Sequence, residues 1–214
     1  WKQLCNALEK ETPDYEGDIE KLFQAELYLI SPLTEPERFL KKEYFLTSQQ
    51  RDIERQILKR IRGEREGYFW FSGLPGTGKT LLLYDIAMKL SVRQRVCIIH
   101  CGEAGKEWKL LHERLRRTDF LADNQLRKTT DLGCYSSILV DEAHLLSLEK
   151  LSVLLAWSEH RPVIFSSDCE DMISQEERKQ NVAEDLVHLP DIQVFHLTNR
   201  IRTNAEVSSF ILNM

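Results

Sequence analysis

The sequence lacks the features of several special classes of protein. No apolar run approaches the ~20 residues that a membrane-spanning helix needs, and the first residues include neither part of a secretory signal. We therefore expect no membrane contact. The 29 Lys and Arg against 34 Asp and Glu argue against a polybasic nucleic-acid binder, but not against a local basic groove. The acidic surplus resides in residues 168–185, which hold seven acids and two bases.

The five cysteines include no Cys-x-x-Cys pair, the spacing that many zinc sites use. Cys97 and Cys101 are four residues apart in an apolar segment, and on a strand they would lie about 13 Å apart, which is too far for a disulfide. An odd, scattered set of cysteines is typical of free thiols in a reducing compartment. We therefore expect a cytoplasmic protein without a zinc site.

What the sequence does contain is a series of five short apolar runs, rich in β-branched or aromatic residues. They are residues 68–72, 96–100, 137–141, 162–166 and 192–197. Such runs are typical of strands buried on both faces of a parallel sheet. Because stretches with helical spacing separate them, we predict an α/β fold, a three-layer sandwich around a mainly parallel sheet of at least five strands.

The first part of the chain differs in character. A helix with an apolar face is predicted before Pro32 and Pro36, which would stop it. We interpret residues 1–45 as a helical N-terminal extension or the end of an upstream domain, and residues 46–214 as the α/β unit. The chain does not start with Met, and we expect it to be part of a longer protein.

A glycine-rich segment follows the first predicted strand. It satisfies the pattern G-x-x-x-x-G-K-[S/T], whose glycines let successive backbone N–H groups point at phosphate oxygens. The following helix directs its positive end at the same anion. A chance glycine-rich turn is disfavoured because a strand precedes the segment and an amphipathic helix follows it. We assign nucleotide binding to Gly73, Pro75, Gly76, Thr77, Gly78, Lys79 and Thr80.

These residue types also suggest the ligand. Lys79 can reach the β- and γ-phosphates as a point charge, and the hydroxyl of Thr80 can ligate Mg²⁺. We therefore expect ATP and Mg²⁺ as cofactors, with Lys79 also counted among the catalytic residues.

The third predicted strand ends in Asp141, which Glu142 follows directly. An Asp at this place can hold the water shell of Mg²⁺, and an adjacent Glu can orient or deprotonate an attacking water. Asp141 could instead cap a helix that begins near Leu145, but the glycine-rich segment upstream favours a catalytic pair with Asp141 as a metal ligand. Glu142 favours hydrolysis over the transfer chemistry of a small-molecule kinase. His144 could couple the phosphate state to a substrate track or form a hydrogen bond at a helix start.

The two motifs resemble the Walker A and Walker B (DExH-type) boxes of helicase-like ATPases. Residues 46–50, LTSQQ, are similar to the Q-motif of superfamily 1, which implies that Gln50 contacts adenine. Thr47 and Gln50 also match a capping box for the next helix. The segment after the fourth strand resembles motif III, which implies that Asp168 senses the γ-phosphate, although Asp171 replaces the usual Gln.

A third resemblance follows the fifth predicted strand. Residues 197–204 are similar to motif IV, which implies that Arg202 is a catalytic arginine finger in cis. Arg200 stands where the family has Asn, so either arginine could meet the phosphate, and the segment could also be a solvated helix start. The combination is most similar to the Schlafen-type helicase-like ATPases and their bacterial relatives. It implies a RecA-like P-loop NTPase lobe, with a second RecA-like lobe in the full-length chain.

The same resemblance implies single-stranded DNA or RNA as a partner. The composition does not show where this nucleic acid would bind. The helix predicted around Trp108 is explained better as an exposed helix with charges of both signs, with Trp108 in the core. We therefore expect the ATP-hydrolysing lobe of a helicase- or translocase-like motor, weakly active as a fragment. The alternative is a nucleotide-controlled, AAA+-like switch that does not move nucleic acid.

Overall fold

The computed structural model describes residues 30–102, 108–127, 129–158, 161–168 and 182–198. The helix expected before Pro32 lies outside these residues. None of the helices within them is long and apolar enough to cross a membrane.

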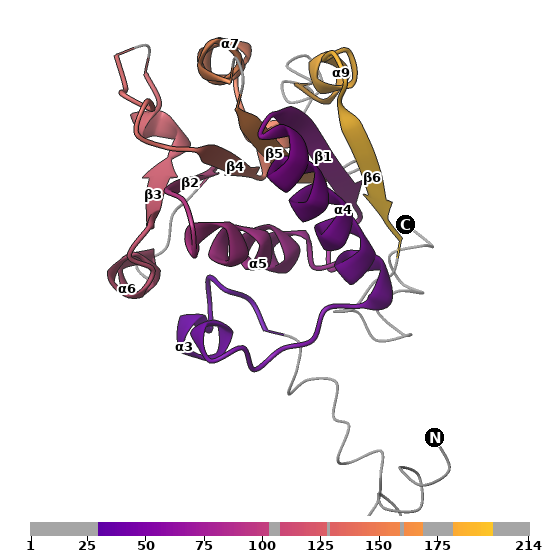
Figure 1. Cartoon of the computed structure of the whole chain (residues 1–214), viewed down its shortest axis with the longest axis vertical. Coiled ribbons are helices and arrows are strands. Elements are labelled where there is room, and N and C mark those ends of the chain that lie inside the picture. The colour runs from indigo at the N-terminus through magenta and orange to yellow at the C-terminus, as the bar shows by residue number, and fades with distance from the viewer. Residues whose placement is uncertain (1–29, 103–107, 128, 159–160, 169–181, 199–214) are drawn as a thin grey trace, which may run out of the picture.

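A sheet of six parallel strands forms the centre of the molecule (Figure 1). The strands are β1 (Gly67–Gly73), β2 (Val96–His100), β3 (Thr118–Ala122), β4 (Ser137–Asp141), β5 (Pro162–Asp168) and β6 (Gln193–Leu197). Their spatial order is β3-β2-β4-β5-β1-β6, and every pairing is parallel. The predicted parallel sheet is thus confirmed, and the five predicted strands are all present with ends shifted by at most two residues.

Helices cover both faces of the sheet. They are α3 (Pro36–Leu40), α4 (Ser48–Glu64), α5 (Lys79–Ser91), α6 (Trp108–Arg114), α7 (Leu148–Trp157) and α9 (Val182–Val187), with 3₁₀ turns η2 (Asp123–Gln125) and η3 (Ala143–Leu145). Because successive residues of a strand point to opposite faces, Phe69 and Phe71 of β1 pack with α4 and α5, whereas Trp70 packs with α7. These two apolar clusters make the three-layer sandwich that the sequence predicts.

The described part of residues 1–45 packs on the α5 side of the sheet. Pro36 begins the short helix α3, where a missing N–H costs nothing because the first helical N–H has no intrahelical partner. Phe39 of this helix is fully buried, stacks on Tyr44 with ring centroids 5.4 Å apart, and meets Tyr84 of α5 edge-on. Ile30 is buried in the same cluster.

Strand β3 is the one strand in the described residues that the sequence analysis did not predict. Only Thr118 of its five residues is buried, as expected for a strand at the edge of the sheet, so its sequence carries no continuous apolar run. The sequence predicts that the helix around Trp108 also carries Leu115, Arg116 and Arg117, but the helix is shorter than that. It ends at Arg114, which leaves Leu115 outside it, while Arg116 and Arg117 lead into β3.

Candidate functional site

The glycine-rich loop connects β1 to α5 at the carboxyl edge of the sheet. Gly76 and Gly78 have φ angles of 80° and 78°, which L side chains rarely adopt. A Cβ atom on Gly73 would lie 2.7 Å from the carbonyl oxygen of Leu197, so this glycine is required by close packing against β6. Pro75 lies exposed at the turn, and the hydroxyl of the buried Thr77 donates to the carbonyl of Leu74 at 2.8 Å. The loop therefore has the curled backbone that a phosphate cradle needs.

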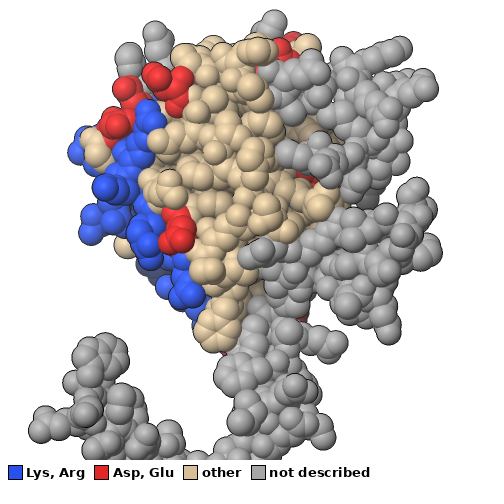
Figure 2. Space-filling view, turned by 90° about the vertical axis from the view of Figure 1, so that its right-hand side faces the viewer, with Lys and Arg blue, Asp and Glu red and all other residues tan. Residues whose placement is uncertain are grey.

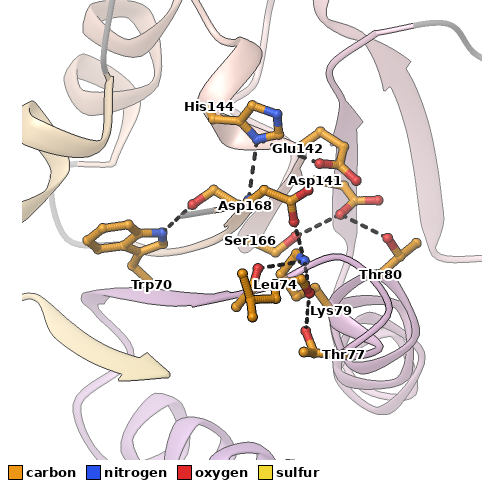
Figure 3. Close-up of polar contacts among 12 residues, drawn as sticks. Trp70, Leu74, Thr77, Lys79, Thr80, Asp141, Glu142, His144, Ser166 and Asp168 are labelled. Atoms are coloured by element: carbon orange, nitrogen blue, oxygen red, sulfur yellow. Dashed lines mark hydrogen bonds and ion pairs between the residues drawn. The ribbon is translucent and has the colours of Figure 1, made fainter. Parts of the chain in front are cut away.

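Lys79, the first residue of α5, turns its side chain back into this loop (Figure 3). Its ammonium group donates to the carbonyl oxygens of Gly73 at 2.9 Å and Leu74 at 3.0 Å, and it forms an ion pair with Asp168. Asp168 reaches it because β5 pairs with β1 along its whole length, with Asp168 opposite Gly73. A bound phosphate would therefore compete with a carboxylate for the same ammonium group.

Replacing Asp168 by asparagine should tighten the binding of ADP, by up to about tenfold, because the phosphate no longer displaces a negative charge from Lys79. Titration with a fluorescent ADP measures the dissociation constant. Asp119→Asn is the matched control, since Asp119 pairs with Arg95 at the far edge of the sheet. Unchanged or weaker ADP binding by Asp168→Asn would contradict this competition.

Asp141, at the end of β4, is fully buried and is surrounded by polar partners (Figure 3). One carboxylate oxygen accepts from Ser166 at 2.7 Å and from Thr80 at 3.4 Å. The other lies 3.3 Å from Nδ1 of His100. Burial disfavours the charged form of His100, but the hydrogen bond and charge of Asp141 outweigh it and raise the His100 pKa. The paired hydroxyl and carboxylate oxygens of Thr80 and Asp141 are ligands of the kind that Mg²⁺ takes together with phosphate oxygens and water.

Glu142 follows with a φ angle of 54°, an uncommon conformation for a residue other than glycine. Its carboxylate lies 3.6 Å from Nδ1 of His144, and the same ring nitrogen accepts from the backbone N–H of Asp168 at 3.4 Å. Burial and the charges of Asp141 and Asp168 raise the pKa of Glu142 to about 7, while Lys79 opposes this rise. A carboxylate with such a pKa is suited to accept a proton near neutral pH.

Asp141 is not a helix cap in this structure. The turn η3 follows Glu142, and α7 begins at Leu148 with Ser147 as its N-cap, so the helix expected near Leu145 starts three residues later. His144 lies in η3 and contacts the acidic residues of the site through one ring nitrogen.

Gln50, from the first turn of α4, uses both ends of its amide. Its oxygen accepts from the backbone N–H of Thr47 at 2.9 Å, and the Thr47 hydroxyl accepts from the N–H of Gln50, so the predicted capping box is confirmed. Its nitrogen donates to the carbonyl oxygens of Thr77 at 3.0 Å and Gly78 at 3.4 Å. The buried Gln50 therefore ties the start of α4 to the phosphate loop.

The site also includes residues that the sequence analysis did not single out. The first is His100, which the register of β2 and β4 places directly opposite Asp141. Ser166 lies inside β5 and holds the Asp141 carboxylate. A signal was available for His100, because it ends a predicted strand at the ligand-binding edge of the sheet. Asp171, Arg200 and Arg202 lie outside the described residues.

No family model and no curated protein matches the chain. Solved structures with a similar fold include three of Pif1 helicases. The Bacteroides enzyme in complex with ADP-AlF3 and ssDNA has a TM-score of 0.50 and 17% identity, and the match covers 79% of this chain and 46% of that one. The Bacteroides enzyme in complex with ADP-AlF4 and a Pif1 pair described at forked dsDNA have TM-scores of 0.44 and 0.49, at 14% identity each.

This chain spans just under half the length of those helicase chains, between 45% and 48%. The expected resemblance to Schlafen-type ATPases is not supported by these comparisons, in which the three structures named above are of Pif1 helicases. The parallel six-stranded sheet, its helical layers and the similarity to the ssDNA-bound Bacteroides structure agree on one architecture. The chain has the RecA-like P-loop NTPase fold.

Proposed function

We propose that this chain is the ATP-binding and ATP-hydrolysing lobe of a helicase- or translocase-like motor that acts on nucleic acid. The proposal rests on one observation above all. The ends of β1, β4 and β5 bring Lys79, Asp141, Glu142 and Asp168 into one connected cluster beside a curled, glycine-dependent loop. That arrangement suits phosphoryl transfer, in which positioning and electrostatic stabilisation do most of the work.

Each residue has a role in this proposal. The backbone N–H groups of the loop residues Gly76, Thr77 and Gly78 would hold the phosphates of ATP. Lys79 would release Asp168 and pair with these phosphates instead. Thr80 and Asp141 would hold Mg²⁺, which supplies charge stabilisation on the phosphate oxygens when bound.

The hydrolytic step is assigned to Glu142, the residue after Asp141. Glu142 would orient the attacking water and accept its proton, with His144 and Asp168 placed beside it to report the phosphate state.

Further assignments also belong to the proposal. Arg202 would act as the arginine finger, with Arg200 as its alternative, and Gln50 would contact adenine in addition to its bonds to the loop. A second RecA-like lobe would complete the ATP site in a longer chain, and the protein would work in the cytoplasm. Single-stranded DNA or RNA would be the substrate, because the Bacteroides Pif1 helicase of similar fold binds ssDNA.

The test is the ATPase rate of the full-length protein with and without single-stranded DNA or RNA. We expect at least a tenfold stimulation, because nucleic acid in a motor completes the catalytic geometry across the two lobes. Heparin is the polyanion control and should have little effect. ATP turnover that is indifferent to nucleic acid would favour the AAA+-like switch, and phosphate transfer to a metabolite would indicate a kinase instead.

A further inference from the structure

The outward face of α4 carries a row of basic side chains. Arg51, Arg55, Lys59 and Arg62 are spaced four, four and three residues apart, which places them on one face of a helix, and all four are exposed. At 1.5 Å per residue the row is about 16 Å long. Figure 2 shows Lys and Arg gathered in a band down one edge of the molecule, on the side where α4 lies in Figure 1.

The row leads into a cleft of about 770 Å³ between the ends of α4 and α5. Arg62, Arg65, Arg93 and Arg161 line the cleft, and no Asp or Glu of the described part of the chain does. Lys89 also lines it, but its ammonium group forms ion pairs with Glu54 and Asp85. The cleft is therefore a concentrated site of positive charge.

The cleft and the ATP site lie at opposite ends of the sheet. The cleft is lined by Pro162, the first residue of β5, whereas the Asp168 that contacts Lys79 is the last residue of the same strand. An anion in the cleft would therefore be separate from any nucleotide on the glycine-rich loop.

Most of these charges have no acidic partner in the described part of the chain. Arg51, Lys59, Arg62, Arg65 and Arg93 form no ion pair with another described residue. Among the other bases, Arg55 is paired with Asp52 at 3.0 Å, and Arg161 lies over the ring of Trp157 at 5.0 Å. The Arg55 pair is exposed, and such pairs contribute little to stability, so it can open at little cost.

We propose that this basic face, formed by Arg51, Arg55, Lys59, Arg62, Arg65, Arg93 and Arg161, binds the phosphate backbone of a nucleic-acid duplex. Arginine predominates in it, and its planar group matches phosphate oxygens. The exposed face of α4 has no aromatic residue on which unpaired bases could stack, and the ring of Tyr135, which lines the cleft, is already covered by Arg95 at 5.5 Å. The row of about 16 Å matches roughly five base pairs along one strand. The inference stands apart from the ATPase proposal because the basic face shares no residue with the nucleotide site.

The proposal is tested with the full chain and a fluorescent 20-base-pair DNA duplex. We expect Lys59→Gln/Arg62→Gln/Arg93→Gln to bind the duplex at least tenfold more weakly. Its plot of log K against log salt should also be flatter by about 2.7, because each phosphate contact contributes about 0.9. The matched control Lys41→Gln/Arg116→Gln/Arg127→Gln removes the same charge from exposed sites on other elements and should bind within about twofold of the parent.

A second measurement maps the contact directly. The duplex should protect Lys59 from acetylation several-fold while Lys41 and Lys42, which are also exposed, stay reactive. The proposal is overturned if the parent does not bind the duplex, if both triple variants lose affinity equally, or if Lys59 is not protected. Tighter binding of a single strand or of a poly-glutamate peptide at the same residues would also overturn it, in favour of that ligand. Unchanged ATP turnover of the variant without nucleic acid separates this outcome from failure of the ATP site.

Discussion

Lys79→Ala should abolish tight binding of ATP and reduce its turnover at least a hundredfold. The reason is electrostatic, because Lys79 is the cation that faces Asp168 and opposes the charge of Glu142. Without it, phosphate oxygens would enter a site with three nearby carboxylates, and the γ-phosphate would lose one of the positive groups that stabilise its developing charge. Calorimetric titration with ATP and a phosphate-release assay measure the two effects.

The control for this variant must separate loss of a ligand contact from loss of the fold. Lys79 is 6% exposed, so its removal leaves Asp168 without its partner and can lower stability. Lys79→Ala/Asp168→Ala removes both charges and should regain the parental melting temperature without regaining ATP binding. ATP binding by either variant at parental affinity would refute the assignment of Lys79.

The glycine-rich loop illustrates what a sequence can predict. Its geometry depends on residues that are close in the chain, because Gly76, Gly78 and Lys79 act through local backbone angles and a helix start. Asp141 was predicted for a similar reason, since a strand that ends in an acid is visible as a pattern. Such features need no knowledge of which strands are neighbours.

Contacts between strands could not be predicted from the sequence. The pairing of Lys79 with Asp168 depends on β5 lying between β4 and β1, an order that the run of strands along the chain does not reveal. The same holds for His100, which meets Asp141 only because β2 pairs with β4 in a particular register. The bond from Gln49 to the carbonyl of His196 at 2.8 Å, which links α4 to β6, could not be foreseen for the same reason.

The Q-motif residue shows a different limit. The sequence left open whether Gln50 caps α4 or contacts adenine, and the structure confirms the cap and adds the bonds to Thr77 and Gly78. Contact with adenine stays a prediction. The amide nitrogen is engaged by the loop, whereas the amide oxygen has a second lone pair that could accept from an adenine amino group without breaking a bond to the loop.

Glu142→Gln should leave ATP bound but almost unhydrolysed, whereas Lys79→Ala should lose both binding and hydrolysis. The amide keeps the size of the side chain and cannot accept a proton, so we expect turnover to fall about 10²- to 10⁴-fold. Affinity for ATP should hold or rise, because one of the negative charges near the phosphates is removed. Single-turnover hydrolysis and equilibrium binding of ATP measure the two quantities.

The structure supplies the reason why this position should matter so specifically. The backbone of Glu142 is left-handed, and the pKa of its carboxylate is raised to about 7. Both features lower stability, and an ordinary surface acid would have neither. Glu113→Gln, on the exposed side of α6, removes the same charge elsewhere and should turn over ATP like the parent. If Glu142→Gln also turned over at the parental rate, another group would have to activate the water. The cluster of Asp141, Glu142 and Asp168 would then be a nucleotide sensor without a hydrolytic base.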